Sequence, residues 1–295
     1  MAAKKRPKPL PAKEHKARVW IIGVAAAVAA TLVGTFVIAV VPQIFDVRKL
    51  GDDVRTGDAL SITLLGEKNT SGGWQAVFPR ADANAAQQFM VPGPFPQDVH
   101  DYLRRELDAG AFLLGGANLQ VEVEGRRNEE ITLYDVRPVV TREQLPTGPV
   151  TAIGSQGNDT LQMTFNLDSP QPIATISDGS PQDGDAYFDD RRIGFTDGHK
   201  ETLSLSLHAY TGAYSLAIAF DYEISGVKYT QMLRRATGPF RVAAALCVAQ
   251  ADRAKVPADV QRTFAGMSYQ SAVGVDFGSA YKIVPMDPKK VCIGH

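Results

Sequence analysis

Hydrophobic and polar residues follow three patterns in turn along the 295-residue chain. Residues 19–41 are apolar throughout and carry no charged side chain. Between residues 99 and 107, apolar side chains recur at spacings of three and four, which predicts an amphipathic helix. Beyond residue 117, apolar and polar residues alternate one by one, which predicts strands with one buried face.

Short turns separate the alternating segments, and the two-residue turn Ser225-Gly226 indicates a β-hairpin. Antiparallel strands joined in this way form sandwiches in which each sheet buries one face. We therefore predict a mainly β protein, an immunoglobulin-like antiparallel β-sandwich with a small α+β portion. The predicted strands are 59–65, 74–78, 119–124, 130–141, 161–167, 203–209, 214–222, 227–233 and 281–285.

The same patterns divide the chain into six segments. They are a basic cytoplasmic tail (1–18), a transmembrane helix (19–41), a stalk (42–58), the α+β portion (59–117), the β-sandwich (118–240) and a C-terminal segment packed on the sandwich (241–295).

The apolar segment is long enough to be a transmembrane helix. At about 1.5 Å per residue, residues 19–41 span roughly 35 Å, which exceeds a hydrocarbon core of about 30 Å. The preceding residues 1–18 hold seven basic side chains and one acidic side chain, so the positive-inside rule places the N-terminus in the cytoplasm. A cleaved signal peptide would have a shorter apolar region and a small-x-small cleavage site. We therefore expect a single-pass membrane protein, a signal-anchor in the lipid bilayer with an extracytoplasmic C-terminal domain.

Three small residues share one face of this predicted helix. Ala26, Ala30 and Gly34 are spaced four residues apart, and small residues allow two membrane helices to approach closely. This face is a candidate for homodimerisation through the membrane helix, although alanine and glycine are also common in such helices.

The charge is distributed unevenly along the chain. Of its 31 basic and 32 acidic residues, the part that follows residue 41 holds 24 and 31. An acidic domain repels polyanions, so we expect no nucleic-acid partner.

Cys247 and Cys292 are the only cysteines, and both belong to the part expected outside the cytoplasm, where disulfides persist. A bridge between them would add about 4 kcal/mol to stability in the chain-entropy treatment. The alternative is two separate thiols.

The sequence contains no metal, phosphate, dinucleotide or nucleophile motif in a suitable context, so we predict no enzyme activity and no cofactor. A weak candidate for a calcium site is a group of four carboxylates, since calcium prefers several oxygen ligands. The pattern is not that of an EF-hand, and such a run is commonly a solvated loop. The four residues are Asp183, Asp185, Asp189 and Asp190.

The stretch Val121–Val140, VEVEGRRNEEITLYDVRPVV, and more weakly Thr164–Pro172, TFNLDSPQP, resemble a group of actinobacterial single-pass membrane proteins. That group combines a Lys/Arg/Pro tail, an Ala/Val-rich anchor and an extracytoplasmic β-domain. It has no assigned activity, so the resemblance implies topology and fold but no mechanism.

The leading hypothesis is a non-catalytic binding or structural module that recognises a protein or another component of the cell envelope. One alternative is an extracytoplasmic enzyme that acts on cell-wall or extracellular substrate. It would require two or three of a set of five side chains to converge in one pocket. The five are His199, His208, Asp189, Asp190 and Ser268. A second alternative is an accessory subunit of a membrane complex.

Overall fold

The computed structural model describes residues 58–70, 74–94, 98–153, 163–176, 185–248, 250–276 and 282–291. These residues belong to one compact unit that begins at Asp58. The predicted tail, transmembrane helix and nearly all of the stalk lie outside the described residues. Among the helices of the described part, none is long and apolar enough to cross a membrane.

Strands dominate this unit, which confirms the predicted mainly β fold. The strands are β1 (Leu60–Asn69), β2 (Trp74–Val77), β3 (Gly93–Pro94), β4 (Phe112–Leu114), β5 (Gly116–Gly125), β6 (Ile131–Glu143), β7 (Pro149–Ile153), β8 (Met163–Asn166), β9 (Thr175–Ile176), β10 (Ile193–Phe195), β11 (Lys200–His208), β12 (Ala213–Ile224), β13 (Val227–Leu233), β14 (Phe240–Ala243), β15 (Ser271–Asp276) and β16 (Lys282–Met286). The helices are α3 (Ala83–Ala86), α4 (Val99–Asp108) and α5 (Ala258–Ala265), with 3₁₀ turns at η1 (Arg80–Asp82), η2 (Gln87–Phe89), η3 (Gln250–Lys255) and η4 (Pro288–Lys290).

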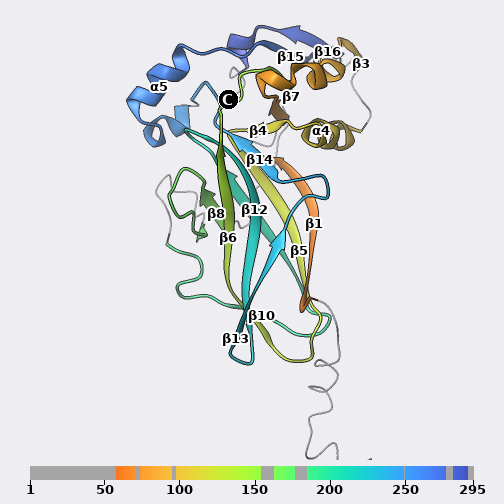
Figure 1. The fold of residues 1–295 in the computed structure, drawn as a ribbon, viewed down its shortest axis with the longest axis vertical. Helices are drawn as coiled ribbons and strands as arrows, with labels where there is room; N and C mark the ends of the chain where they lie inside the picture. The colour runs from red at the N-terminus through yellow and green to blue at the C-terminus, as the bar shows by residue number, and fades with distance from the viewer. Residues whose placement is uncertain are drawn as a thin grey trace, which may run out of the picture. The chain divides into compact units, whose positions relative to one another are not determined.

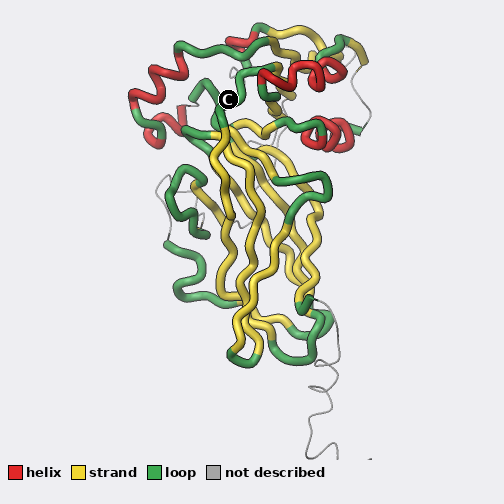
Figure 2. Tube along the Cα trace, in the orientation of Figure 1, coloured by secondary structure: helices red, strands yellow, loops and turns green. Residues whose placement is uncertain are grey.

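These strands form two sheets (Figure 1). The smaller sheet has the order β1-β5-β11-β8-β9. The larger sheet has the order β10-β6-β12-β14-β4-β2-β7-β15-β16-β3, and β13 pairs with β12 beside this path. The long strands run through the lower part of the view, whereas the α-helices gather at the upper end with the short strands β3, β4, β7, β15 and β16 (Figure 1 and Figure 2).

One hydrophobic core is shared by the long strands of the two sheets. In β5, Leu119, Val121 and Val123 are fully buried, and Ile218 and Phe220 of β12 are buried in the same cluster. Full burial of each such side chain contributes about 2 kcal/mol. The alternation seen in the sequence is therefore the pattern of strands that each turn one face toward this core.

The predicted helix and the predicted hairpin are both present. Helix α4 begins after Asp98, whose carboxylate accepts a hydrogen bond from the Asp101 backbone N–H at 2.9 Å. It ends before Gly110, which has a φ of 99° that favours glycine. Strands β12 and β13 are joined at Ser225 and Gly226, with φ values of 49° and 83°, as a two-residue turn of this hand requires.

Strands from the segments predicted on either side of residue 117 pair with each other. Strand β1 pairs with β5 over most of its length, and β4 pairs with β14. Strand β7 pairs in parallel with β15, which belongs to the predicted C-terminal segment. The predicted boundaries stay predictions, but the hydrogen bonding crosses both of them.

Candidate functional site

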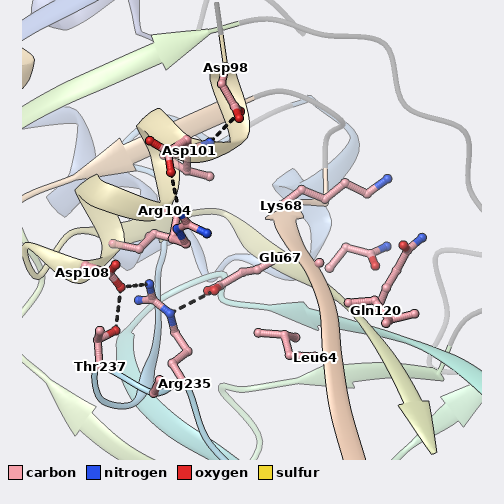
Figure 3. A pocket seen from close by; sticks show the side chains of 16 residues that line it. Leu64, Glu67, Lys68, Asp98, Asp101, Arg104, Asp108, Gln120, Arg235 and Thr237 are labelled. Carbon is pink, nitrogen blue, oxygen red and sulfur yellow. Dashed lines mark hydrogen bonds and ion pairs between the residues drawn. The ribbon is translucent and has the colours of Figure 1, made fainter. Parts of the chain in front are cut away.

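A pocket of about 780 Å³ lies between β1, helix α4 and the turn that follows β13 (Figure 3). Strand β5 contributes to its lining from beside β1. Part of the lining is apolar and consists of Leu64, Leu65, Leu103 and Leu107. The rest is largely polar or charged, and includes four carboxylates, two arginines and a lysine.

A β-bulge in β1 determines which side chains reach the buried side of the sheet here. The pairing of β1 with β5 shifts between Leu64 and Gly66, so that Leu65 is inserted and is 54% exposed. Without the extra residue, Gly66 and Lys68 would continue the inward alternation of Leu64. With it, Glu67 lies opposite the buried Leu119, and a carboxylate takes an inward position.

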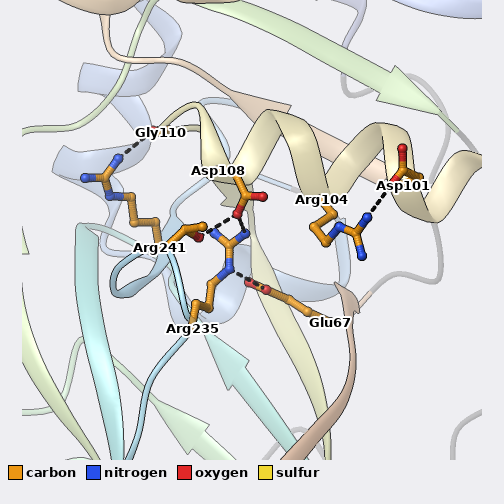
Figure 4. Close-up of polar contacts among 8 residues, drawn as sticks. Glu67, Asp101, Arg104, Asp108, Gly110, Arg235 and Arg241 are labelled. Atoms are coloured by element: carbon orange, nitrogen blue, oxygen red, sulfur yellow. Dashed lines mark hydrogen bonds and ion pairs between the residues drawn. The ribbon is translucent and has the colours of Figure 1, made fainter.

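The Arg235 guanidinium holds two carboxylates together at the centre of the pocket (Figure 4). Its Nε lies 3.2 Å from Glu67 Oε2, and its Nη2 lies 2.5 Å from Asp108 Oδ1. The Thr237 hydroxyl donates to the same Asp108 oxygen at 2.6 Å. The side chains of Arg235 and Glu67 are only 7% and 9% exposed, so this pair is largely desolvated.

The second oxygen of Glu67 has no comparable partner. Glu67 Oε1 is buried, and no group of the described residues donates a hydrogen bond to it. Burial raises the pKa of Glu67 from 4.5 to about 7, because the carboxylate is removed from water; Arg235 opposes this rise and Asp108 adds to it. The pocket therefore contains one buried acceptor that a ligand could satisfy, on a group that can exchange a proton near neutral pH.

The C-terminal end of α4 is tied to the larger sheet. Arg241 Nη1, from β14, donates to the Gly110 carbonyl just after the helix at 2.9 Å (Figure 4). Near the N-terminal end, Arg104 forms an ion pair with Asp101 within the helix itself. The Arg241 contact therefore holds this end of the helix against the sheet beside the pocket.

A second buried carboxyl lies on α4 outside the pocket lining. Glu106 is 0% exposed, and its Oε2 accepts from the Thr151 hydroxyl at 3.2 Å. Its Oε1 is buried without a hydrogen-bond partner in the described part of the chain. Burial raises the pKa of Glu106 to about 8; the Thr151 hydrogen bond and Arg105 oppose this rise.

A third polar cluster is saturated and is therefore structural. The Asp168 carboxylate accepts from the backbone N–H of Tyr210 at 2.6 Å, from the backbone N–H and hydroxyl of Thr211, and from the Tyr214 hydroxyl at 2.6 Å. Gly212 leaves room for this arrangement, because a Cβ there would lie 2.5 Å from the Tyr214 hydroxyl oxygen. The cluster fixes the entry to β12.

The candidate calcium ligands are only partly described. Asp183 lies outside the described residues, and Asp185, Asp189 and Asp190 are exposed. Within the described ranges, no three His, Cys, Asp or Glu side chains are placed to hold a metal ion. The calcium site therefore stays a prediction that rests on Asp183 joining the other three.

Cys247 is disulfide-bonded. Its predicted partner, Cys292, lies outside the described residues, as do Ala26, Ala30 and Gly34. The Cys247–Cys292 pairing and the helix–helix face thus stay predictions.

The two histidines considered for catalysis lie far apart. His199 precedes β11 and His208 ends it, so at about 3.3 Å per residue they are roughly 30 Å apart. His208 lies 3.1 Å from the Ser206 hydroxyl and stacks on Tyr210, and Ser268 is exposed. His199 and His208 therefore cannot serve the same site.

The sequence pattern missed the residues that the pocket brings together. Glu67, Asp108 and Arg235 are separated by 41 and 127 positions, so no spacing motif connects them. The available signal was Gly66 directly after the predicted strand 59–65, because a glycine in an extended segment is typical of a bulge and the strand continues beyond it.

No protein-family model and no curated protein matches the chain.

Proposed function

We propose that this chain is a membrane-anchored extracytoplasmic module that binds a component of the cell envelope without catalysis. In this proposal residues 19–41 form the transmembrane anchor, and the long strands form an immunoglobulin-like sandwich. The ligand enters the pocket between β1, α4 and the turn at residues 235–237. The uncharged anchor segment, the basic tail before it and the shared core of the two sheets support this arrangement.

The observation that carries the binding role is Glu67 Oε1. A buried acceptor without a donor is unfavourable by about 1–3 kcal/mol. The described residues leave Glu67 Oε1 without a donor, on a side chain that lines a cavity large enough for a ligand. A bound partner that donates to Glu67 would remove this penalty. The exposed Leu65 at the bulge then offers apolar contact at the pocket.

Site-specific photo-crosslinking in living cells tests this role. A photoreactive benzoylphenylalanine in place of Leu65 should capture a partner that the same residue in place of Val139, an exposed position on β6, does not. The adduct should disappear when Ala236→Trp fills the pocket from its exposed turn. Arg234→Trp, on the same turn but outside the pocket lining, is the matched control and should leave the adduct in place.

Two results would contradict the proposal. Identical adducts from positions 65 and 139 would show that capture does not depend on the pocket. An adduct at position 65 that survives Ala236→Trp would place the contact elsewhere. Protease added to intact cells separately tests the topology, because it should digest the domain after residue 57 and leave the N-terminal tail protected.

A further inference from the structure

Some hydrogen-bonding groups of the pocket already have partners within the protein, and others do not. The Arg235 guanidinium is already shared between Glu67 and Asp108, and Arg104 is paired with Asp101. Lys68 extends away from the Glu67–Arg235 pair (Figure 3). Among the buried polar side-chain atoms of the pocket lining, the one without a partner in the described residues is an acceptor, Oε1 of Glu67. A ligand that satisfies this acceptor must donate a hydrogen bond.

The charge of the pocket and of the domain further restricts which kind of hydrogen-bond donor would bind. The pocket lining has four carboxylates against two arginines and Lys68, and the two arginines are engaged by three of the carboxylates. The domain as a whole is acidic, with 24 basic and 31 acidic residues after residue 41. Both the local and the long-range field thus favour a cation over a neutral or an anionic donor.

The apolar part of the lining indicates the kind of chain to which the positively charged group is attached. Leu64 and Leu65 come from β1, and Leu103 and Leu107 come from α4, so leucines line the pocket from both elements. Lysine side chains pack their methylene groups along apolar surface and keep the ammonium at a polar end. An alkylammonium chain matches both the leucines and the Glu67 acceptor.

We propose that the pocket binds a lysine side chain of a polypeptide partner, with its methylenes against the leucines and its ammonium paired with the Glu67 carboxylate, which lines the pocket. This inference rests on the proposed function and narrows its ligand to a partner with an exposed lysine. The ammonium replaces the missing donor, and the partially exposed Asp101 at the pocket adds a second negative charge near it.

Ligand-observed saturation-transfer NMR on the full chain in detergent tests the inference with defined probes. Nα-acetyl-lysine amide is compared with Nα-acetyl-norleucine amide, which has the same stem without the ammonium, and with 1,5-diaminopentane as a free amine. The lysine probe should bind at least about tenfold more tightly than the norleucine probe, as expected for a charge-assisted hydrogen bond. The free diamine carries the same alkylammonium chain and should bind as well, because the leucines and the Glu67 carboxylate are the groups that recognise it.

Variants locate the interaction. Glu67→Gln should weaken the lysine probe at least about tenfold, and Asp101→Asn should weaken it less. Glu201→Gln, an exposed change at the start of β11, is the charge-matched control and should have no effect. Asp101→Asn is exposed, so it keeps the test decisive if Glu67→Gln unfolds the chain.

The outcomes separate this inference from the function on which it rests. If the norleucine probe binds as well as the lysine probe, and Ala236→Trp abolishes binding, the ligand class is wrong and the pocket remains a binding site. If binding of every probe survives Ala236→Trp, the pocket is not the site and the proposed function falls as well. Lysine binding that is unchanged in both Glu67→Gln and Asp101→Asn overturns the inference alone.

Discussion

Replacing the buried Glu106 by glutamine should stabilise the fold at alkaline pH and leave it almost unchanged in acid. Glu106 is fully buried on α4, and its pKa is raised from 4.5 to about 8. A carboxyl whose pKa is raised on folding binds its proton more tightly in the folded than in the unfolded chain. The free energy of unfolding therefore falls as pH rises from about 4.5 to about 8.

The magnitude follows from that shift. Each pKa unit corresponds to about 1.4 kcal/mol, so the rise from 4.5 to about 8 corresponds to roughly 5 kcal/mol, of which about 4 is already lost at pH 8. Glutamine resembles the protonated carboxyl, because its amide can donate to the Thr151 hydroxyl while that hydroxyl donates to the Ala76 carbonyl, 3.4 Å away. Glu106→Gln should thus gain about 4 kcal/mol over the native chain at pH 8 and nearly nothing at pH 4.5.

Urea denaturation of the full chain in detergent, followed by far-ultraviolet circular dichroism at the two pH values, measures this difference. Glu67 contributes a slope of the same sign between pH 4.5 and about 7, but it is present in both proteins and cancels in their difference. Glu201→Gln, at an exposed position, should change the free energy of unfolding by less than about 0.5 kcal/mol at either pH. The reasoning is refuted if Glu106→Gln and the native chain lose stability equally between pH 4.5 and 8, or if the variant is the less stable at pH 8.

Three further predictions concern other buried polar groups, each measured by urea denaturation at pH 7. Asp168→Ala should lower the free energy of unfolding by about 3 kcal/mol, since the donors around it lose their common acceptor; a loss below 1 kcal/mol would contradict this. Asn69→Ala should lower it by about 3 kcal/mol, because the side chain satisfies the Leu114 carbonyl in the core and both backbone groups of Gln75. Arg235→Met should lower it by about 3–5 kcal/mol by leaving Glu67 buried and unpaired, and adding Glu67→Met should recover most of that loss; no recovery would argue against a desolvated pair.

The sequence predicted those features that depend on neighbouring residues. The alternation through β5, β11 and β12 matches strands that turn one face to a shared core, and such a period is visible without knowing which strands pair. The amphipathic spacing over residues 99–107 predicted α4 nearly to its ends. The Ser225-Gly226 turn joins adjacent strands, so its local geometry was enough to predict the hairpin.

The pocket depends on information that no local pattern contains. Glu67 looks like an ordinary polar residue near the end of a strand, and its burial follows from the bulge that reverses the alternation after Leu64. Arg235 reaches it from a turn 168 positions later, and Asp108 approaches from the end of a helix. The candidates chosen from local sequence include His199, which precedes β11, and His208, which ends it, and the extended strand between them keeps them apart.

The sequence by itself therefore determined the class of fold, the positions of the long strands and of α4, and the uneven distribution of charge, because each follows from short-range periodicity or from composition. Only the tertiary structure decided which charged residues meet and which of them lose contact with water. Pairing between distant strands sets those distances, and burial sets the protonation of Glu67 and Glu106. Neither quantity is encoded in the spacing of residues along the chain.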